Sequence, residues 1–296
     1  MTEKIAVIGM GQMGSGMARR LTSSGLDVIG YDVSTQARQA LRNDGFTMAD
    51  STAEAVAGRD IVLSSLPDPK AVRSAWLDQG GLVEVAAKGT LVLELSTIDP
   101  DTMREVAAAA AAKGIDVIDS PVSGGPNEAA NGTMTLICGG DEAALSRAEP
   151  VLRLLGSNWK HTGPVGTAKA VKLVNNMMSM GNVLIAAEAF AMGMAAGVDP
   201  EKLFDVISVS GGRSFHFQKR FPNAIKGDYR PGFKMELGEK DLALAMDFAR
   251  SLGMPTPGTA TVRNLMAIAL AEGYRGQDVV ALHDMYVRWG KKAKSD

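Results

Sequence analysis

A lysine and two asparagines, Lys172, Asn175 and Asn176, stand together in an otherwise apolar stretch of the sequence. Their spacings of three and four residues place all three on one face of a helix. Such groups are costly to bury unless they are partnered. A lysine whose pKa is lowered by desolvation or by a nearby positive charge can exchange a proton near neutral pH. On these residues alone, proton transfer and a snorkelling lysine at a domain edge both remain open.

A second candidate is the segment Ser120-Pro121-Val122-Ser123-Gly124-Gly125, which follows a strand-like run. The hydroxyl of Ser123 and the backbone of Gly124 and Gly125 can offer hydrogen-bond donors to a small anion such as a carboxylate. An ordinary Pro/Gly turn fits the same residues. Leu66-Pro67 and Ser96-Thr97 also follow strand-like runs. Because ligands of open parallel sheets bind at the carboxyl ends of the strands, we include both segments among the candidates.

The N-terminal segment Gly9-Met10-Gly11-Gln12-Met13-Gly14 lies between an apolar run and a helix-like stretch. In such a pattern the first glycine permits a tight turn, the second admits a pyrophosphate, and the third lets helix and strand pack closely. Asp32 ends the next strand-like run, 18 residues beyond Gly14, near the ~20 typical of a ribose-binding acid. A glycine turn without a ligand is the alternative, but the residues on both sides favour a dinucleotide site.

The dinucleotide hypothesis bears on the other candidates. Asp32 favours NAD over NADP, because a 2′-phosphate would meet a like charge, although Arg38 lies close in sequence. An oxidised nicotinamide would also supply the positive charge that lowers the pKa of a lysine. Next to a dinucleotide site, Lys172 therefore fits proton transfer better than snorkelling.

The remaining composition excludes several other classes of function. The three histidines, His161, His216 and His283, show no metal-ligand spacing, so we expect no catalytic metal. A net charge of −2 gives no attraction to nucleic acid or to an anionic membrane. Cys138 is the only cysteine and reads as a buried strand position, which favours a reducing compartment. With a strand beginning by Lys4, there is no room for a signal peptide, and we expect a cytoplasmic protein.

Two domains are expected from the order of the elements. Strand-like runs at 4–8, 27–31, 60–64, 90–95, 115–119, 133–138 and 158–161 alternate with helical stretches, such as 11–24, 99–113 and 141–155. This alternation predicts an α/β domain with a mostly parallel, doubly wound sheet over residues 1–163. Residues 164–296 carry only helical patterns, at 165–196, 200–209, 214–225, 236–252, 256–272 and 278–289. They predict an all-helical second domain that begins with a long interdomain helix.

That long helix is apolar around much of its circumference, which is typical of a buried helix. Polar residues within it, Ser179, Asn182 and Glu188, suit burial in protein better than a bilayer. Met177, Met180, Leu184 and Phe190 do not fall on one stripe, so at least two surfaces should cover them. We therefore expect a homodimer or homotetramer. The alternative is that the later helices wrap the long helix within one chain.

Taken together, these motifs resemble the β-hydroxyacid dehydrogenase family almost from end to end. The resemblance covers Gly9–Gly14, Leu66-Pro67, Leu95–Pro100, Asp119–Gly125, Gly132-Thr133, Gly163, Gly166, Lys172 with Asn175-Asn176, and Lys240-Asp241-Leu242. It implies a Rossmann-type domain, an interdomain helix and a helical second domain. It also implies hydride transfer between NAD and a small 3-hydroxy acid or its semialdehyde.

The resemblance further implies roles for single residues. Lys172 resembles the catalytic acid/base and Asn176 its polar partner, while Ser123-Gly124-Gly125 resembles the loop that holds the substrate carboxylate. Lys240 resembles the residue that reaches into the cleft from the second domain. Lys240 is expected to contact both substrate and cofactor. The other cofactor contacts are expected from Gly9–Gly14, Asp32, Leu66-Pro67 and Ser96-Thr97.

The chain departs from the family pattern at two positions. Ala168 replaces a third glycine before the catalytic helix, and Glu128-Ala129 stands where many members have Gly-Ala. A carboxylate at 128 would disfavour a second negative group on the substrate if it pointed inward. Arg213 lies where the family varies its substrate contacts, and it fits either a second acidic group or a surface ion pair. Two other functions stay open: an imine reductase, which typically lacks the lysine, and a non-catalytic dinucleotide-binding scaffold.

Overall fold

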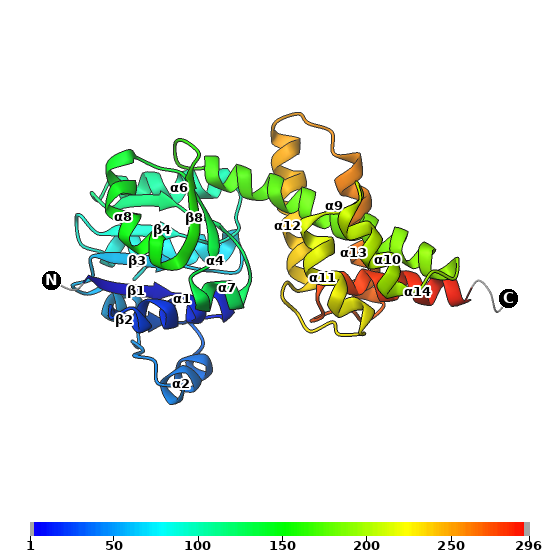
Figure 1. Ribbon diagram of the computed structural model, residues 1–296. Coiled ribbons are helices and arrows are strands. Elements are labelled where there is room, and N and C mark those ends of the chain that lie inside the picture. Colours follow the sequence, from blue (N-terminus) through cyan, green and yellow to red (C-terminus); the bar gives the residue numbers. More distant parts are fainter. Residues whose placement is uncertain (1–2, 293–296) are drawn as a thin grey trace. The chain divides into compact units, whose positions relative to one another are not determined.

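A computed structural model describes residues 3–292 of the chain (Figure 1). It divides into two compact units, residues 1–172 and residues 173–296, which we call the first and second units. The first unit is an α/β domain and the second is all-helical, as the sequence predicts. Each unit has a hydrophobic core of its own.

The first unit is built on a five-stranded, entirely parallel sheet. Its strands, in the spatial order β2-β1-β3-β4-β5, are β2 (Asp27–Tyr31), β1 (Lys4–Ile8), β3 (Ile61–Ser64), β4 (Leu91–Glu94) and β5 (Asp116–Asp119). All five were expected within one or two residues at each end. Because successive side chains of a strand point to opposite faces, Ile5 and Val7 enter one core layer and Ala6 and Ile8 the other.

Helices cover both faces of this sheet (Figure 1). On one face lie α1 (Gln12–Ser23), α7 (Pro126–Asn131) and α8 (Glu142–Leu155). The other face carries α3 (Thr52–Val56), α4 (Pro69–Leu77), α5 (Leu82–Val85) and α6 (Pro100–Ala111). The remaining helix of the unit, α2 (Thr35–Asn43), follows the edge strand β2. The sheet is therefore doubly wound, with a closed core on each side.

A second, three-stranded sheet was not anticipated. It contains β6 (Val122–Ser123), β7 (Met134–Cys138) and β8 (Gly156–His161), with β6 antiparallel and β8 parallel to β7. The sequence pattern assigned the last two of these strands to one mostly parallel sheet. A strand of two residues is too short to show alternation, so β6 could not be recognised.

Aspartate–proline pairs begin three helices in the way the sequence predicts. The side chains of Asp68, Asp99 and Asp199 accept hydrogen bonds from backbone N–H groups three residues on, at 2.8, 2.8 and 3.0 Å. In each case a proline follows in the first turn, where its missing N–H costs nothing. These caps fix where α4, α6 and α10 begin.

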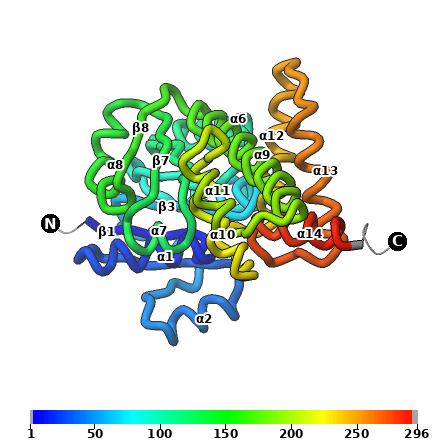
Figure 2. Tube along the Cα trace, turned by 45° about the vertical axis from the view of Figure 1, so that its right-hand side comes forward, coloured from blue at the N-terminus to red at the C-terminus, as the bar shows by residue number. Residues whose placement is uncertain are grey.

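The second unit packs around the body of α9 (Thr167–Ala195). Its other helices are α10 (Pro200–Val209), α11 (Phe215–Ile225), α12 (Met235–Ser251), α13 (Pro257–Ala271), the 3-10 turn η1 (Val279–Ala281) and α14 (Leu282–Lys292). Helices α12 and α13 form an antiparallel hairpin, seen from two directions in Figures 1 and 2. Phe190 of α9 packs against Phe217 and Phe221 at ring distances of 5.9 and 5.2 Å.

Helix α9 belongs to both units, since the division falls between Lys172 and Leu173. The sequence pattern placed the boundary earlier, at 163/164, where the helix had not yet begun. The first turn of α9 joins the first unit because Asp119, at the end of β5, accepts hydrogen bonds from the backbone of Gly166 and Lys169. The division of the chain therefore cuts a continuous helix.

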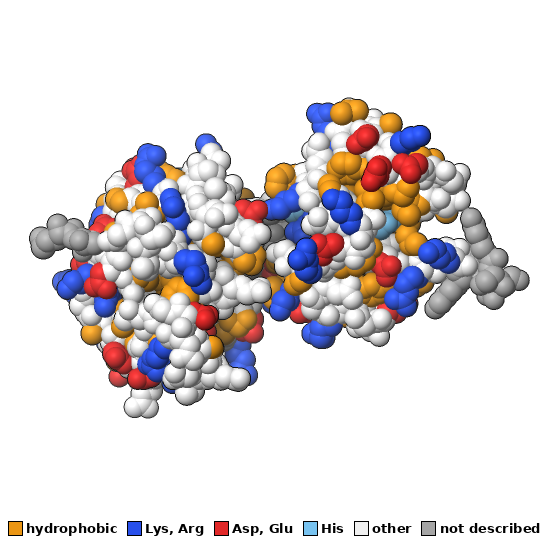
Figure 3. All heavy atoms as spheres, turned by 60° about the horizontal axis from the view of Figure 1, so that its bottom comes forward, with side chains coloured by type: hydrophobic (Ala, Val, Ile, Leu, Met, Phe, Trp, Pro, Cys, Tyr) orange, Lys and Arg blue, Asp and Glu red, His pale blue; other side chains and the backbone are white. Residues whose placement is uncertain are grey.

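Burial of α9 differs from the sequence expectation. Met180, Leu184 and Phe190 are buried by the second unit itself, and Met177 is partly buried against the same core, so these four residues require no second chain. Another face stays uncovered: Met178, Ile185 and Met192, spaced seven residues apart, are 65%, 61% and 71% exposed. Hydrophobic side chains are visible at the surface of the second unit in Figure 3.

Length and composition alone would also allow α9 to cross a membrane, and it is the one such helix among residues 3–292. A third of its most apolar window is buried inside the protein. The core helix of a soluble protein can have the same length and composition, so this one helix is weak evidence for a membrane span.

Candidate active site

The glycine turn after β1 has the shape that a pyrophosphate requires. Gly9 adopts φ +87°, and a Cβ there would lie 2.3 Å from the carbonyl oxygen of Ser65. A Cβ on Gly14 would lie 1.9 Å from the carbonyl oxygen of Gly9, so helix and turn pack too closely for any side chain. Gly11, the N-cap of α1, is exposed, and a Cβ there would meet nothing within 4 Å. A side chain would therefore clash at the first and third glycines, whereas the second glycine has open space around it.

The structure brings Asp32 to this turn. Its Oδ2 accepts a hydrogen bond from the backbone N–H of Met10 (3.0 Å), and its Oδ1 accepts one from that of Ser34 (2.9 Å). Each carboxylate oxygen can accept a second bond, so two hydroxyls of a ribose can still be bound. The side chain of Met10 is buried against Gly30, which leaves only its backbone to face a ligand. Asp32 and the Gly9–Gly14 turn, both predicted to bind the dinucleotide, therefore lie next to each other.

The guanidinium of Arg38 is bonded to oxygen atoms of three nearby residues. Its Nη1 donates to the carbonyl oxygens of Asp32 and Val33 (2.7 and 3.2 Å), and Nη2 donates to Oγ1 of Thr35 (3.1 Å). The guanidinium stacks on the ring of Tyr31 at 5.6 Å, and the side chain is 12% exposed. Arg38 thus fastens the start of α2 and is committed to protein groups.

Two of the strand-end segments are linked by a buried serine. The hydroxyl of Ser96, 3% exposed, accepts a hydrogen bond from the backbone N–H of Leu66 (2.8 Å). The backbone N–H of Ser96 in turn donates to the Glu94 carboxylate (2.7 Å). Pro67 is exposed and Thr97 half-buried. Ser96 therefore joins the loops after β3 and β4, and Pro67 and Thr97 are left as the surface residues of these segments.

The Ser123–Gly125 segment lies at the start of α7. Ser123 pairs with Thr135 in β6 and β7 and is half-buried, whereas Gly124 is exposed with φ +144°. The backbone N–H of Gly125 donates to Oε2 of Glu128 at 2.8 Å. Glu128, the residue at which this chain departs from the family pattern, therefore turns back onto one of the amides expected to hold a substrate carboxylate.

The lysine and two asparagines are on α9 as predicted. Lys172 is 9% exposed and Asn176 is 4% exposed, and Asn175 donates from Nδ2 to Oδ1 of Asn176 (3.1 Å). Within the second unit, Nδ2 of Asn176 donates to Oδ2 of Asp241 (2.6 Å), and Nζ of Lys240 lies 2.9 Å from Oδ1 of the same carboxylate. Asp241 thus holds Asn176 and Lys240 together.

Arg213 and Cys138 are two further residues that the sequence analysis singled out. Arg213 is exposed in the turn between α10 and α11, where its backbone N–H donates to the carbonyl oxygen of Ser210 (3.2 Å). Cys138 is buried in β7, and burial raises the pKa of its thiol to about 11, so it stays protonated at neutral pH. Residues 3–292 contain no group of three or more side chains suited to hold a metal ion.

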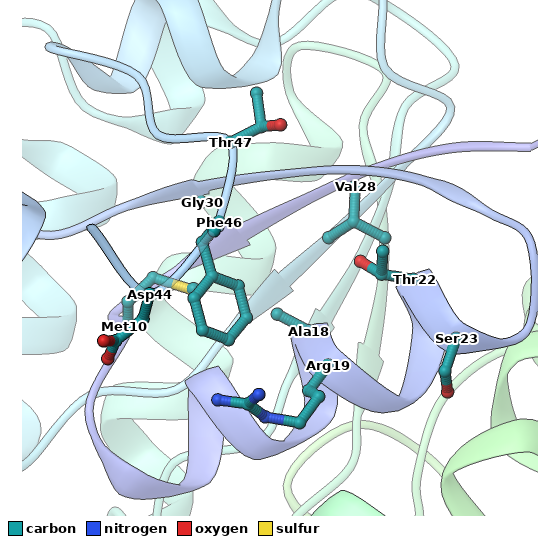
Figure 4. A pocket seen from close by; sticks show the side chains of 11 residues that line it. Met10, Ala18, Arg19, Thr22, Ser23, Val28, Gly30, Asp44, Phe46 and Thr47 are labelled. Atoms are coloured by element: carbon teal, nitrogen blue, oxygen red, sulfur yellow. The ribbon is translucent and has the colours of Figure 1, made fainter. Parts of the chain in front are cut away.

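A cavity of about 260 Å³ lies elsewhere in the first unit, between α1, β2 and the segment after α2 (Figure 4). Arg19, Thr22, Phe46 and Thr47 are among the residues that line it, and the Arg19 guanidinium lies 5.0 Å from the Phe46 ring. Of the predicted site residues only Met10 touches it. The cavity is therefore separate from the open edge of the glycine turn at Gly11.

Sequence reasoning missed one polar cluster, which is entirely buried. Lys169, Asp119 and Glu94 have side chains that are 0% exposed at the ends of β4 and β5 and the start of α9. Nζ of Lys169 lies 3.1 Å from Oδ1 of Asp119 and donates to the carbonyl oxygen of Glu94 (2.7 Å). The available signal was a second lysine three residues before Lys172, on the same helical face.

Comparisons with known proteins agree with this geometry. Residues 4–163 match the NAD-binding domain of 6-phosphogluconate dehydrogenase, and residues 166–286 match the family described as the NAD-binding domain of NADP-dependent 3-hydroxyisobutyrate dehydrogenase. The chain is 34% identical to 2-(hydroxymethyl)glutarate dehydrogenase of Eubacterium barkeri, over 94% of this chain and 93% of that protein. It is 35% identical to the NAD-dependent L-serine dehydrogenase of Pseudomonas aeruginosa, over 96% and 98%.

A solved structure extends the likeness to the whole fold. The 3-hydroxyisobutyrate dehydrogenase of Mycobacterium tuberculosis, determined with L-serine, superposes with a TM-score of 0.87. The two sequences are 33% identical, and the match covers 96% of this chain and 99% of the Mycobacterium tuberculosis chain. Both units and the long helix are therefore shared with a 3-hydroxyisobutyrate dehydrogenase.

Proposed function

Because the chain belongs to the β-hydroxyacid dehydrogenase family, we propose that it interconverts a small 3-hydroxy acid and the corresponding aldehyde or ketone with NAD(H). When bound, the nicotinamide takes up or gives the hydride. The observation that carries this proposal is the glycine turn, closed at Gly9 and Gly14 and open at Gly11, with the Asp32 carboxylate bound to its backbone. A turn of that shape at the start of a helix binds a pyrophosphate.

NAD is the proposed cofactor in preference to NADP. Asp32 presents a negative charge where the 2′-phosphate of NADP would lie. Arg38, the cation nearest in sequence, is held by the carbonyl oxygens of residues 32 and 33. The next residue, Val33, is 86% exposed and uncharged. Comparing kcat/KM for the two cofactors tests the assignment, and a preference for NADP would overturn it.

Lys172 is the proposed acid/base. In the oxidation its neutral amine accepts the proton of the substrate hydroxyl, and in the reduction its ammonium returns that proton. Asn176, one turn further along α9, is held by Asp241 and stays oriented for a polar contact. Lys240, paired with the same carboxylate, is the proposed contact to substrate and cofactor from α12.

The substrate carboxylate is proposed to bind at the Ser123 hydroxyl and the neighbouring backbone amides. Glu128 already accepts a hydrogen bond from the amide of Gly125, which leaves the hydroxyl of Ser123 and the exposed backbone of Gly124 as the open positions. Substrates named for the relatives, 2-(hydroxymethyl)glutarate, L-serine and 3-hydroxyisobutyrate, are the first compounds to test. Arg213 is the proposed residue for a second acidic group.

The test of this function is a spectrophotometric screen for NADH formation with these hydroxy acids and their close analogues. We expect turnover with at least one of them, and loss of that turnover in Lys172→Ala. Reduction of a cyclic imine with no oxidation of any hydroxy acid would instead assign an imine reductase. Tight NADH binding without either reaction would assign a non-catalytic scaffold.

We also propose that the protein is a homo-oligomer in which a second copy covers α9. The uncovered residues Met178, Ile185 and Met192 repeat every seven residues, the spacing at which two helices pack side by side along one seam. Water exposure of such a stripe is unfavourable, and a second α9 offers a matching apolar face. In sedimentation equilibrium we expect a mass that is a multiple of 31.0 kDa. A concentration-independent mass of 31.0 kDa would overturn the proposal.

The interface itself can be tested with one substitution. Ile185→Asp places a charge in the middle of the exposed stripe, and we expect it to lower the mass observed at equilibrium. Glu201→Ala, on the exposed start of α10, is a matched control that should leave the mass unchanged.

A further inference from the structure

Lys169 is buried to an extent that is rare for lysine. Its side chain is 0% exposed, and the carboxylate of Asp119, its ion-pair partner, is also 0% exposed. Nζ of Lys169 and Oδ1 of Asp119 lie 3.1 Å apart, and Nζ donates a hydrogen bond to the carbonyl oxygen of Glu94 (2.7 Å). Lysines are almost never fully buried unless paired.

Asp119 also closes the first turn of α9. Its Oδ2 accepts hydrogen bonds from the backbone N–H groups of Gly166 (2.9 Å) and Lys169 (3.2 Å). Its own backbone pairs with Gly139 in both directions, at 2.9 and 2.8 Å. A carboxylate at this end of a helix complements the helix dipole and satisfies N–H groups that lack a partner within the helix. The end of β5 therefore determines where α9 starts.

Glu94 extends the cluster to the loops after β3 and β4. Its carboxylate accepts hydrogen bonds from Nε1 of Trp76 (3.0 Å) and from the backbone N–H of Ser96 (2.7 Å). The Ser96 hydroxyl accepts one from the backbone N–H of Leu66. Glu94 thus contacts Lys169 through its backbone carbonyl and the proposed cofactor loops through its carboxylate.

We propose that the buried pair of Lys169 and Asp119 is a positioning device for Lys172. Lys172 follows Lys169 by three residues, so its Cα lies about 4.5 Å further along the helix axis, on the same face. Fixing the axial position and rotation of the first turn fixes the point from which the Lys172 side chain extends. The bond to Glu94 sets that point relative to the loops after β3 and β4. This inference rests on the proposed function, since it assigns Lys172 a task that needs exact placement.

Stability alone does not account for the pair. Desolvating two charges costs about as much as their attraction returns, and well-packed apolar residues of similar volume are often as stabilising or more so. Removing one partner, by contrast, leaves an uncompensated buried charge. A pair with little net stabilising value at the base of the helix that carries Lys172 is better explained by the geometry that it imposes.

The test separates placement from stability with two variants. Lys169→Met removes the ammonium and keeps a chain of similar length. Lys169→Met with Asp119→Asn removes both charges and keeps a side-chain oxygen for the N–H groups of α9. Lys113→Met, at an exposed position after α6, is the control and should behave as wild type. For each protein, kcat, the KM for NAD and the melting temperature are measured.

We expect the single variant to melt earlier and to lose roughly 10- to 100-fold in kcat, since a displacement of about 1 Å at a catalytic group can cost about 10²-fold. The double variant should regain most of the melting temperature while its kcat stays low and its KM for NAD stays near that of wild type. If kcat returns together with the melting temperature, the pair acts on stability only and the proposal is wrong.

Lys172→Ala, assayed in parallel, separates this inference from the proposed function. An inactive Lys172→Ala beside a fully active Lys169→Met would overturn the positioning role and leave the acid/base role standing. An active Lys172→Ala would overturn the acid/base role itself. If Lys169→Met alone were inactive while Lys172→Ala remained active, Lys169 would be the proton-transferring lysine, and both assignments would fail.

Discussion

The first turn of α9 and the body of the helix are held by different kinds of interaction. Its first turn, in the first unit, is fixed by the buried ion pair of Lys169 and Asp119 and by the hydrogen bonds that the Asp119 carboxylate accepts from the backbone N–H groups of Gly166 and Lys169. Its body, in the second unit, is held by apolar contacts, with Phe190 against the rings of Phe217, Phe221 and His283. Hydrogen bonds have strict geometry, whereas hydrophobic burial has no preferred direction. The helix is therefore positioned at the end that carries Lys172 and stabilised along the rest of its length.

This contrast predicts that polar changes in the first unit affect turnover and that core changes in the second unit affect stability. Lys172→Ala should give the largest effect, a loss of about 10²–10⁴-fold in kcat, the range typical of a general acid/base. The melting temperature should change little. Lys160→Ala, an exposed lysine of β8, is the control. More than about a tenth of wild-type kcat in Lys172→Ala would assign the proton transfer to another group.

Phe221→Ala tests the other half of the contrast. Phe221 is 0% exposed between Phe190 and Phe217, and truncating such a ring in a core costs about 3–5 kcal/mol of unfolding free energy. We expect urea denaturation to show that loss, while kcat per folded molecule stays close to wild type. Phe215→Ala is the matched control, because that ring is 70% exposed. A large loss of kcat without loss of stability would contradict the contrast.

Glu128→Ala sharpens the contrast within the first unit. Removing the carboxylate bound to the Gly125 amide frees that amide and deletes a negative charge beside the proposed carboxylate loop. A hydroxy acid with two carboxylates should gain roughly fivefold in kcat/KM relative to one with a single carboxylate, because unit charges about 4 Å apart in water interact by about 1 kcal/mol. Glu142→Ala, at the exposed start of α8, should leave the ratio unchanged. An unchanged ratio in Glu128→Ala would place its charge away from the substrate.

The smallest expected effect is a pH dependence of the second unit. Burial lowers the pKa of His283, so the folded protein keeps the ring neutral at a pH where the unfolded chain binds a proton. Stability from this source is therefore complete above the unfolded value of about 6.5 and falls as the pH drops below it. We expect His283→Leu to flatten the dependence of the melting temperature on pH below about 6.5. An equally steep dependence in the variant would assign it to other groups.

Local patterns were sufficient for the parallel strands and for the helices that begin with Asp-Pro, because each is encoded within a few neighbouring residues. They also placed Gly9, Gly11, Gly14 and Asp32 at one turn. The separate sheet that contains β6 was not predicted, because a strand of two residues shows no alternation of apolar and polar side chains. The buried pair of Lys169 and Asp119 escaped because its members are 50 residues apart and only the folded chain brings them together.

The long helix shows a different limit of sequence reasoning. Its composition indicated burial on several sides, which the second unit provides for Met180, Leu184 and Phe190. Composition could not show which face would remain open, since Met178, Ile185 and Met192 are as apolar as their buried neighbours. That distinction depends on where α11, α12 and α14 pack, and no single window of sequence contains this information.

The continuity of α9 also constrains how hybrid enzymes can be assembled from this chain and a relative. A junction between residues 172 and 173 would splice two sequences inside one helix. A junction at 163–166 keeps the helix whole but inherits residue 169 from the donor, while Asp119 comes from this chain. A donor without a lysine there would leave a buried carboxylate uncompensated, a defect that changing Asp119 to asparagine should relieve. In designing such a hybrid, residues 119 and 169 should therefore be taken from the same parent, wherever the junction is placed.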